Sequence, residues 1–183
     1  TVGGTITNGL LKFVTAATNF TVTGPGTAVI GANFEYADAT DNNVAQAFTF
    51  LTGSTGNLQI NGTLTLSATT AGGDGAQFDI GAGRTLTAGN NVTVGSGSSF
   101  IATNGGGTGI LLLDAVTAPL VYSTPAASAV ANLTVADDVN LTGGIAGSTL
   151  TVGTAMIHNA GAIDIGSANL SLGGNYTRIA GTY

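Results

Sequence analysis

The sequence predicts an all-β protein, a right-handed parallel β-helix (β-solenoid) with roughly triangular rungs of about 19 residues. The first observation is a pattern of short apolar pairs, each split by one polar residue, that runs from position 133 to 183. Gly, Asn, Ser or Thr punctuates the pattern, which is typical of short strands joined by turns. The second observation is that every third pair lines up, as three aligned sets show: Leu133, Leu150 and Leu170; Val139, Ile157 and Tyr176; Ile145, Ile163 and Tyr183. Three short strands in each repeat describe a coil with three sides.

The repeat continues upstream with less regularity. Leu58 and Phe78 lie 20 residues apart, and Leu64 and Leu86 lie 22 apart, so we expect the same rung length there. A continuous coil has no natural domain boundary. We therefore expect residues 1–183 to form a single β-solenoid domain of roughly nine rungs.

Composition limits the partners. Hydrophobic residues make up 43% of the chain and charged residues only 7%, with a mean hydropathy of +0.40, which argues against disorder. Lys12, Arg84 and Arg178 are the only basic residues, and the net charge is −6. Such a chain repels nucleic acid and anionic lipid, and its apolar runs are too short for membrane insertion. Low charge with many Thr, Asn and Gly residues favours an extracellular or cell-surface location.

The two ends of the sequence resemble each other. Residues 1–7 read TVGGTIT and residues 171–177 read SLGGNYT, so the chain begins and ends in matching register. Neither end carries a capping element, and an open rung exposes backbone groups that can pair with another strand. Two interpretations follow: the sequence is a segment of a longer coil, or the last rung of one molecule docks on the first rung of the next. We expect the second, in which the protein binds itself as a head-to-tail homopolymer. The expected polymer interface consists of Val2, Thr5 and Ile6 at one end and Leu172, Tyr176, Ile179 and Tyr183 at the other.

The segment from Ile163 to Tyr183 resembles the repeats of bacterial surface β-solenoids, the filamentous-haemagglutinin-like and autotransporter passenger adhesins. The likeness lies in phrases such as NLTV at 132–135 and LSLGGNYT at 170–177. It covers roughly the last 50 residues well, and the stretch from Leu58 to Phe100 moderately. The resemblance implies an extracellular right-handed parallel β-helix that serves as a stalk, adhesin or fibre, and it brings no catalytic residues with it.

The sequence does not predict an enzyme, a cofactor or a metal site. His158 is the only histidine, so a triad or a histidine-based metal cluster would need distant partners, and we expect an outward or corner position for it. Asp137 and Asp138 are adjacent carboxylates that could bind Ca²⁺ or cleave a glycan. Neighbouring side chains in a turn diverge, however, and cleavage of an acidic polysaccharide would also call for nearby basic residues.

Two other functions remain open from the sequence: a ligand-binding adhesin module, for example for surface glycans, and an ice-binding β-solenoid. Rows of Thr-x-Thr would favour ice binding, and we expect Thr63 and Thr65 to share a face with Thr85 and Thr87, while Thr149 and Thr151 lie on another. The sequence also holds seven Asn-x-Ser/Thr triplets, which are candidate glycosylation sites if the producing cell has the machinery. They begin at Asn19, Asn61, Asn91, Asn132, Asn140, Asn169 and Asn175.

Overall fold

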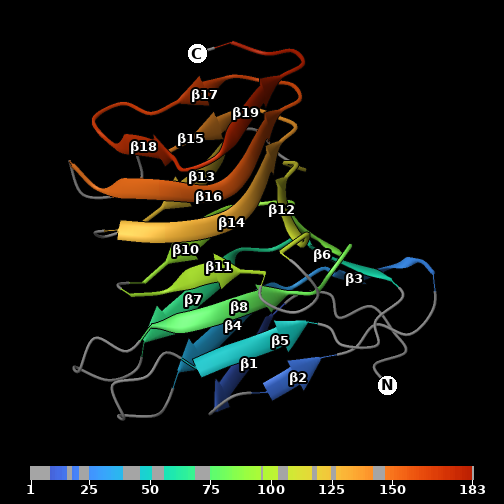
Figure 1. Cartoon of the computed structure of the whole chain (residues 1–183). Helices are drawn as coiled ribbons and strands as arrows, with labels where there is room; N and C mark the ends of the chain where they lie inside the picture. The colour runs from blue at the N-terminus through green and yellow to red at the C-terminus, as the bar shows by residue number, and fades with distance from the viewer. Residues whose placement is uncertain are drawn as a thin grey trace.

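A computed structural model describes residues 9–15, 18–20, 25–38, 46–50, 56–68, 75–95, 97–102, 107–116, 119–124, 127–141 and 147–182. These residues form strands, turns and bends, and none of them is helical. The strands stack from β1 and β2 at the bottom of Figure 1 to β17, β18 and β19 at the top. The all-β class expected from the alternating apolar pattern is therefore confirmed for the described part of the chain.

The strands form two sheets. The 7-stranded sheet has the order β1 (Leu10–Thr15), β4 (Asn33–Asp38), β7 (Leu64–Ala68), β10 (Val92–Val94), β13 (Leu120–Ser123), β15 (Val139–Asn140) and β17 (Ile163–Asp164). The main path of the 12-stranded sheet is β2 (Thr18–Phe20), β5 (Gln46–Phe50), β8 (Ala76–Ile80), β11 (Ser99–Ile101), β14 (Ala127–Val135), β12 (Ile110–Leu113), β9 (Thr85–Ala88), β6 (Asn57–Ile60) and β3 (Thr27–Ile30). Three strands lie off this path: β16 (Thr149–His158) pairs with β14, β18 (Asn169–Leu172) and β19 (Asn175–Arg178).

The pairings of the named strands are all parallel. Strands β1, β4, β7, β10 and β13 pair in succession, so each strand meets the one that follows it three elements later. Strands β2, β5, β8 and β11 follow the same rule, as do β3, β6, β9 and β12. These three series of strands are three positions in each turn of the chain, and the long strands β14 and β16 each span two of them. Strand β14 pairs with both β11 and β12, and β16 pairs with both β18 and β19.

Alternation along the strands builds the core. In β6, β9 and β12 every second side chain is buried, as expected when successive side chains point to opposite faces of a sheet. Parallel pairing then aligns the buried members into columns. One column contains Leu58, Leu86, Leu111, Leu133 and Met156, each at most 1% exposed. Burial of each such side chain contributes about 1.5–3 kcal/mol.

The larger inward groups lie in the earlier strands. The ring centroids of Phe13 and Phe34 are 5.7 Å apart, those of Phe34 and Phe78 are 6.1 Å apart, and those of Phe78 and Phe100 are 6.2 Å apart. These separations are typical of favourable aromatic pairs. The aromatic chain joins the two sheets, because Phe34 belongs to β4 and Phe78 to β8.

The spacing of about 19 residues expected from the sequence fits the last turn but not the earlier ones. Paired residues lie 20 positions apart in the last turn, as Thr149 and Asn169 do, but 30 apart earlier, as Phe34 and Leu64 do. The physical reason is that the corners between strands differ in length. The sheet that contains β1 has seven strands among the described residues, fewer than the nine rungs that a constant short spacing implied.

The expected alignments shift accordingly. Leu150 does pair with Leu170, but Leu133 pairs with Met156, because paired residues of β14 and β16 lie 22 positions apart before the bulge of β16 and 23 apart after it, whereas the expected alignment of Leu133 with Leu150 needs 17. Other expected partners are also replaced by different residues. The observed pairs are Val139 with Ile163, Met156 with Tyr176, Leu58 with Leu86, Leu64 with Val92, and Phe78 with Phe100.

Polar side chains at the corners tie each turn to the next. The Oδ1 atom of Asn33 accepts a hydrogen bond from the backbone N–H of Thr63 at 2.8 Å, and that of Asn57 accepts one from Thr85 at 3.0 Å. These acceptors satisfy backbone donors where the ladder between strands ends, which would otherwise cost free energy. The Asn content of the sequence thus has a structural use.

Candidate functional site

Among the residues that the structure describes, no group of three or more His, Cys, Asp or Glu side chains could hold a metal ion. No helix long and apolar enough to cross a membrane occurs in the part of the chain that the structure describes. The site with the most distinctive geometry is instead one end of the stack.

The outward or corner position expected for His158 is wrong, because its side chain is 0% exposed in the inward row of β16. Its Nε2 atom lies 3.1 Å from the carbonyl oxygen of Gly161, and its Nδ1 atom lies 3.3 Å from the hydroxyl of Tyr176. A carbonyl oxygen only accepts, so in the neutral ring Nε2 donates to Gly161 and the Tyr176 hydroxyl donates to Nδ1. The imidazole therefore joins β16 to β19.

Asp137 and Asp138 act as corner acceptors. The Oδ1 atom of Asp137 accepts from the backbone N–H of Asp138 at 2.8 Å, and the Oδ1 atom of Asp138 accepts from the N–H of Ala162 at 2.8 Å. The second bond crosses from one turn to the next, like those of Asn33 and Asn57. These contacts give both carboxylates a structural role.

We use the name C-terminal face for the inward side chains of the last three strands, namely Ile163 and Ile165 in and after β17, Leu170 and Leu172 in β18, and Tyr176 and Arg178 in β19. Strands β18 and β19 each pair only with β16 among the described strands. One edge of each therefore faces away from the stack. An open edge of this kind can accept another strand.

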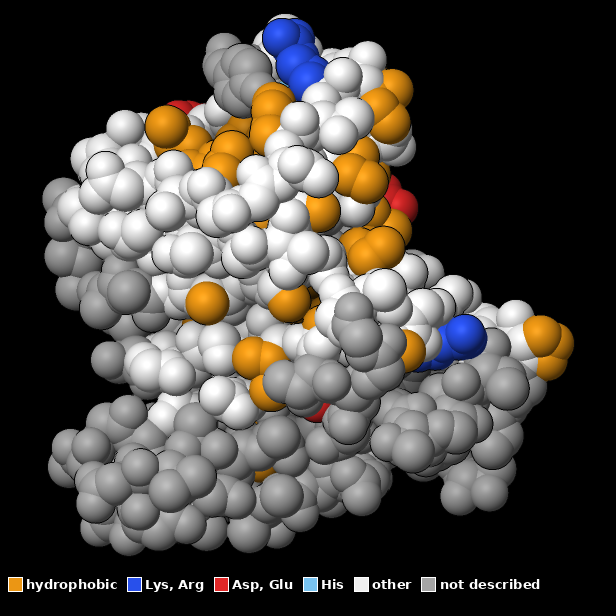
Figure 2. Space-filling model, viewed as in Figure 1, with side chains coloured by type: hydrophobic (Ala, Val, Ile, Leu, Met, Phe, Trp, Pro, Cys, Tyr) orange, Lys and Arg blue, Asp and Glu red, His pale blue; other side chains and the backbone are white. Residues whose placement is uncertain are grey.

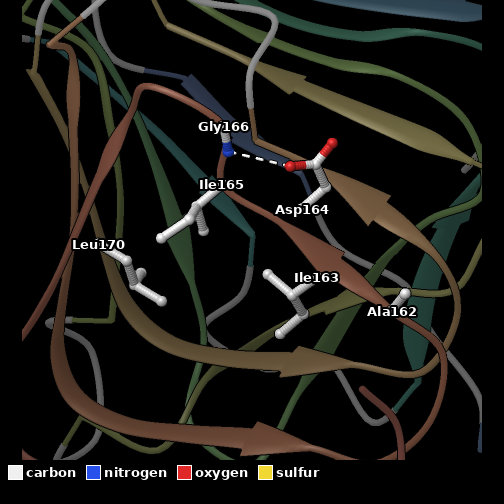
Figure 3. A pocket seen from close by; sticks show the side chains of 6 residues that line it. All are labelled: Ala162, Ile163, Asp164, Ile165, Gly166 and Leu170. Carbon is white, nitrogen blue, oxygen red and sulfur yellow. Dashed lines mark hydrogen bonds between the residues drawn. The ribbon is translucent and has the colours of Figure 1, made fainter. Parts of the chain in front are cut away.

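The C-terminal face is hollow and apolar at its centre. A hollow of about 590 Å³ is lined by Ala162, Ile163, Asp164, Ile165, Gly166 and Leu170. Figure 3 shows the side chains of Ile163, Ile165 and Leu170 directed into it from different sides. The carboxylate of Asp164 points away, and its Oδ1 atom accepts from the N–H of Gly166 at 2.9 Å. The hollow is thus lined by hydrocarbon with a charge at its rim.

Side chains of the last turn are more exposed than their partners below. Leu172 is 41% exposed, whereas Val152, its partner in β16, is 1% exposed. Leu170 is half-buried, whereas its partner Leu150 is 3% exposed. Figure 2 shows hydrophobic side chains gathered at the top of the molecule, where these strands lie, beside a basic side chain. At β18 the face has the inward pattern of a middle turn with no described strand above it, whereas beside β17 Thr182 pairs with Ala162.

The structure describes three of the residues predicted as the polymer interface. Leu172 and Tyr176 belong to the C-terminal face, and Ile179, directly after β19, is 67% exposed. Val2, Thr5, Ile6 and Tyr183 lie outside the described residues. The sequence interpretation missed Ile163, Ile165, Leu170 and Arg178, although the alternation of inward and outward residues was enough to place them on the same side of their strands.

The Thr-x-Thr rows do not form the expected shared face. Thr65 lies in β7 of the 7-stranded sheet, whereas Thr85 and Thr87 lie in β9 of the other sheet. Within β9 the neighbours on one side are Ile110 and Leu112, which interrupt the row of hydroxyl groups. The pairing of the strands, which the sequence did not reveal, places these threonines in different sheets. These described Thr residues therefore do not form the shared row of hydroxyl groups that ice binding would use.

The described Asn-x-Ser/Thr triplets differ in how their amides are used. The Nδ2 atom of Asn132 donates to the carbonyl oxygens of Gly107 and Gly109 at 2.6 and 2.8 Å, and that of Asn169 donates to Gly147 at 3.3 Å. The remaining described side chains are those of Asn61 and Asn140, which are half-buried, and of Asn91 and Asn175, which are exposed. The side chain of Asn19 lies outside the described residues. A glycan on Asn132 would disrupt its two hydrogen bonds.

A second, smaller hollow of about 310 Å³ lies on the outer surface where β12, β14 and β16 run side by side, next to the bulge of β16. Ile110 and Ile157 line it together with the hydroxyl-bearing Thr134 and Thr154. It has no charged lining residue.

Comparisons with protein-family models, with curated proteins and with solved structures find no match for this chain. The function is therefore inferred from the geometry of the C-terminal face and from the way the strands pair.

Proposed function

We propose that the protein is a non-enzymatic structural subunit of an extracellular filament, a surface fibre or an adhesin stalk, and that its copies stack end to end. In this proposal the parallel sheets belong to a right-handed parallel β-solenoid with triangular rungs. The pairing of each strand with the one three elements later supports such a coil, and right-handed crossovers are the rule for parallel strands.

The observation that carries the proposal is the open C-terminal face. Its inward side chains continue the columns of the core, so a rung placed above it would bury Leu170, Leu172 and Ile165, as β18 of the last turn covers Leu150 and Val152 of β16. Each buried aliphatic side chain would contribute about 1.5–3 kcal/mol, and the open edges of the strands would gain backbone hydrogen bonds.

A second copy is the natural occupant because a column that reaches the C-terminal face begins, among the described residues, on an outer strand, β1. Leu11, Phe34, Leu64, Val92 and Tyr122 follow one another along a column that crosses the 7-stranded sheet. Extending the register of β13, β15 and β17 by one residue continues this column to Leu141 and Ile165. Leu11 at its first position is half-buried, and Ile165 at its last is 40% exposed. Strand β1, which carries Leu11, pairs only with β4 among the described strands. Stacking the first turn of one copy on the last turn of another would join the two ends of this column.

The proposal is tested by sedimentation velocity and electron microscopy of the 183-residue chain with a pair of matched variants. Leu172→Lys places a charge on the C-terminal face, and Val116→Lys places the same charge at a corner where the side chain is 65% exposed. We expect the wild type and Val116→Lys to form fibres, and Leu172→Lys to need at least about tenfold more protein to do so.

Fibre diffraction gives an independent readout, since fibres that grow along the stacking direction would show the strand spacing of about 4.8 Å along the fibre axis. The proposal is contradicted if the wild type remains monomeric at every concentration, or if Leu172→Lys assembles as readily as Val116→Lys while both variants stay folded.

A further inference from the structure

The hollow of about 310 Å³ on the outer surface lies where the C-terminal half of β14 runs between β12 and β16. We use the name outer hollow for it, and the lining residues that matter for its chemistry are Ile110, Asn132, Thr134, Thr154, Ala155 and Ile157. Strands β12, β14 and β16 contain no Asp, Glu, Lys or Arg, and their one histidine is buried. The outer hollow is therefore an uncharged site.

Strand geometry sets the size of the outer hollow. Asn132 and Thr134 lie on either side of the buried Leu133 and so point outward, and they pair with Ala155 and Ile157 of β16. Neighbouring strands lie about 4.8 Å apart and alternate side chains about 7 Å apart, so a surface across three strands measures about 10 by 7 Å. This area and a volume of about 310 Å³ fit a small ligand unit such as one sugar ring.

The side-chain amide of Asn132 supplies a fixed hydrogen-bond acceptor. Its Nδ2 atom donates to the carbonyl oxygens of Gly107 and Gly109 at 2.6 and 2.8 Å, which holds the half-buried amide in place. Its Oδ1 atom accepts no hydrogen bond from another residue that the structure describes. An amide oxygen has two lone pairs, so this atom can accept from a ligand without any rearrangement of the protein.

Two hydroxyl groups lie beside this acceptor. Those of Thr134 and Thr154 form no hydrogen bond with any part of the chain that the structure describes. The bulge of β16 places Gly153 and Thr154 opposite the single residue Ala131, and the side chain of Thr154 is exposed. Bulges redirect side chains and are frequent next to binding sites. Each hydroxyl can both donate to a ligand and accept from it.

Hydrocarbon flanks these polar groups on both sides. Ile110 belongs to β12 and Ile157 to β16, the two strands between which this part of β14 runs, and both side chains are half-buried. The outer hollow therefore presents apolar surface at its sides and a row of hydrogen-bonding groups between them.

This arrangement selects one class of ligand. A charged ligand would find no opposite charge in the lining, and the net charge of −6 repels anions further. A purely apolar ligand would cover the amide and hydroxyl groups without pairing them, which costs free energy. A peptide could not add as a strand, because this half of β14 is paired on both sides. A sugar ring, by contrast, combines apolar C–H faces with hydroxyls that donate and accept.

We propose that the outer hollow is a binding site for an uncharged sugar residue of a glycan. Ile110 and Ile157 contact the C–H groups of the ring, the Oδ1 atom of Asn132 accepts from one hydroxyl, and Thr134 and Thr154 bind others. The lining has no aromatic side chain, so we expect weak binding of a single unit, with a Kd of about 1–10 mM. The inference goes beyond the proposed function and does not depend on it, since the outer hollow shares no residue with the C-terminal face.

Saturation-transfer difference NMR tests the inference, because it observes the ligand and detects millimolar binding to the 183-residue chain whether or not copies assemble. The probes are the uncharged methyl β-glycosides of glucose, galactose and N-acetylglucosamine. Glucuronate, n-hexanol and the dipeptide N-acetyl-glycyl-glycinamide are the charged, apolar and peptide controls. We expect at least one glycoside to bind the wild type, and each control ligand to bind at least about tenfold more weakly than that glycoside.

Matched variants locate the site. Ala155→Phe fills the outer hollow with a ring at an outward position of β16, and Ala129→Phe adds the same ring at an exposed position of β14 outside the hollow. Thr134→Val removes one hydroxyl and keeps the shape of the side chain. We expect Ala129→Phe to bind the glycoside like the wild type, Ala155→Phe to bind at least about tenfold more weakly, and Thr134→Val about three- to tenfold more weakly.

The inference is overturned if no glycoside binds the wild type, if Ala155→Phe binds as well as Ala129→Phe, or if a control ligand binds as tightly as the best glycoside. Circular dichroism checks that each variant is folded. Should Ala155→Phe fail to fold, Thr134→Val decides, and binding equal to that of the wild type contradicts the inference. A chain that stays monomeric and binds the glycoside through the outer hollow would contradict the proposed function and support this inference.

Discussion

Single residues at the corners decide how closely successive turns approach. Gly161 adopts a φ of +77°, which L side chains rarely adopt, and a Cβ atom at this position would lie 2.2 Å from the backbone carbon of Asp137. Gly83 also has a positive φ, +62°, but a Cβ atom there would meet nothing within 4 Å. At position 161 glycine is needed both for the positive φ and for the close approach of the backbone, whereas at position 83 it is needed only for the positive φ.

This difference gives a prediction at the residue scale. Gly83→Ala should destabilise the protein by about 1 kcal/mol, the cost of a left-handed backbone for alanine. Gly161→Ala should cost at least about 2 kcal/mol more, because the backbone of the preceding turn must also move. Urea unfolding of both variants measures the two losses. Equal losses would mean that the turns do not approach as closely as the structure shows.

At the scale of elements, one polar cluster links three consecutive strands of the 7-stranded sheet. Lys12 in β1 forms an ion pair with Glu35 in β4 at 2.7 Å, and the hydroxyl of Ser67 in β7 donates to the same carboxylate at 2.8 Å. Burial by itself raises the pKa of Glu35, but the hydrogen bonds from Lys12 and Ser67 and the charge of Lys12 together hold this pKa below its usual range.

A lowered pKa in the folded state makes the contribution of Glu35 to stability depend on pH. The stabilisation is present above the pKa of an unfolded glutamate, and it is lost as the pH falls through the lower pKa of the folded state. We expect Glu35→Gln to lower the free energy of unfolding by about 0.5–1 kcal/mol at neutral pH and by much less in acid. Lys12→Gln should show the same dependence. A loss that is equal at both pH values would contradict the electrostatic origin.

At the scale of the whole molecule, buried contacts are spread along the stack, and we expect local stability to decline toward the C-terminal face. Each turn contacts mainly the turns before and after it, as in other repeat architectures. Leu111 lies in the middle of its column and is 0% exposed, whereas Leu172 lies in the last turn and is 41% exposed. The same substitution should therefore have very different costs at these two positions.

Leu111→Ala should destabilise the monomer by about 2–5 kcal/mol, because it removes buried contacts and leaves a cavity. Leu172→Ala should cost less than about 1 kcal/mol and leave the global transition almost unchanged. Chemical unfolding at a protein concentration below the onset of assembly measures both. Hydrogen exchange adds a local test, in which the amides of β18 and β19 are expected to exchange before those of β9 and β12. Equal protection of these strands would contradict the gradient.

The sequence by itself determined the all-β class and the alternation of inward and outward side chains, because these follow from a local period of two residues. It also determined the parallel strands, because groups of three short strands recur along the chain and each strand then pairs with its counterpart in the next turn. It also placed Leu172 and Tyr176 in the last strands of the chain. Only the tertiary structure decided which turns meet, because corners of unequal length shift the register without changing the local pattern. For the same reason the burial of His158 and the outer hollow between β12, β14 and β16 emerged only once the strands were paired.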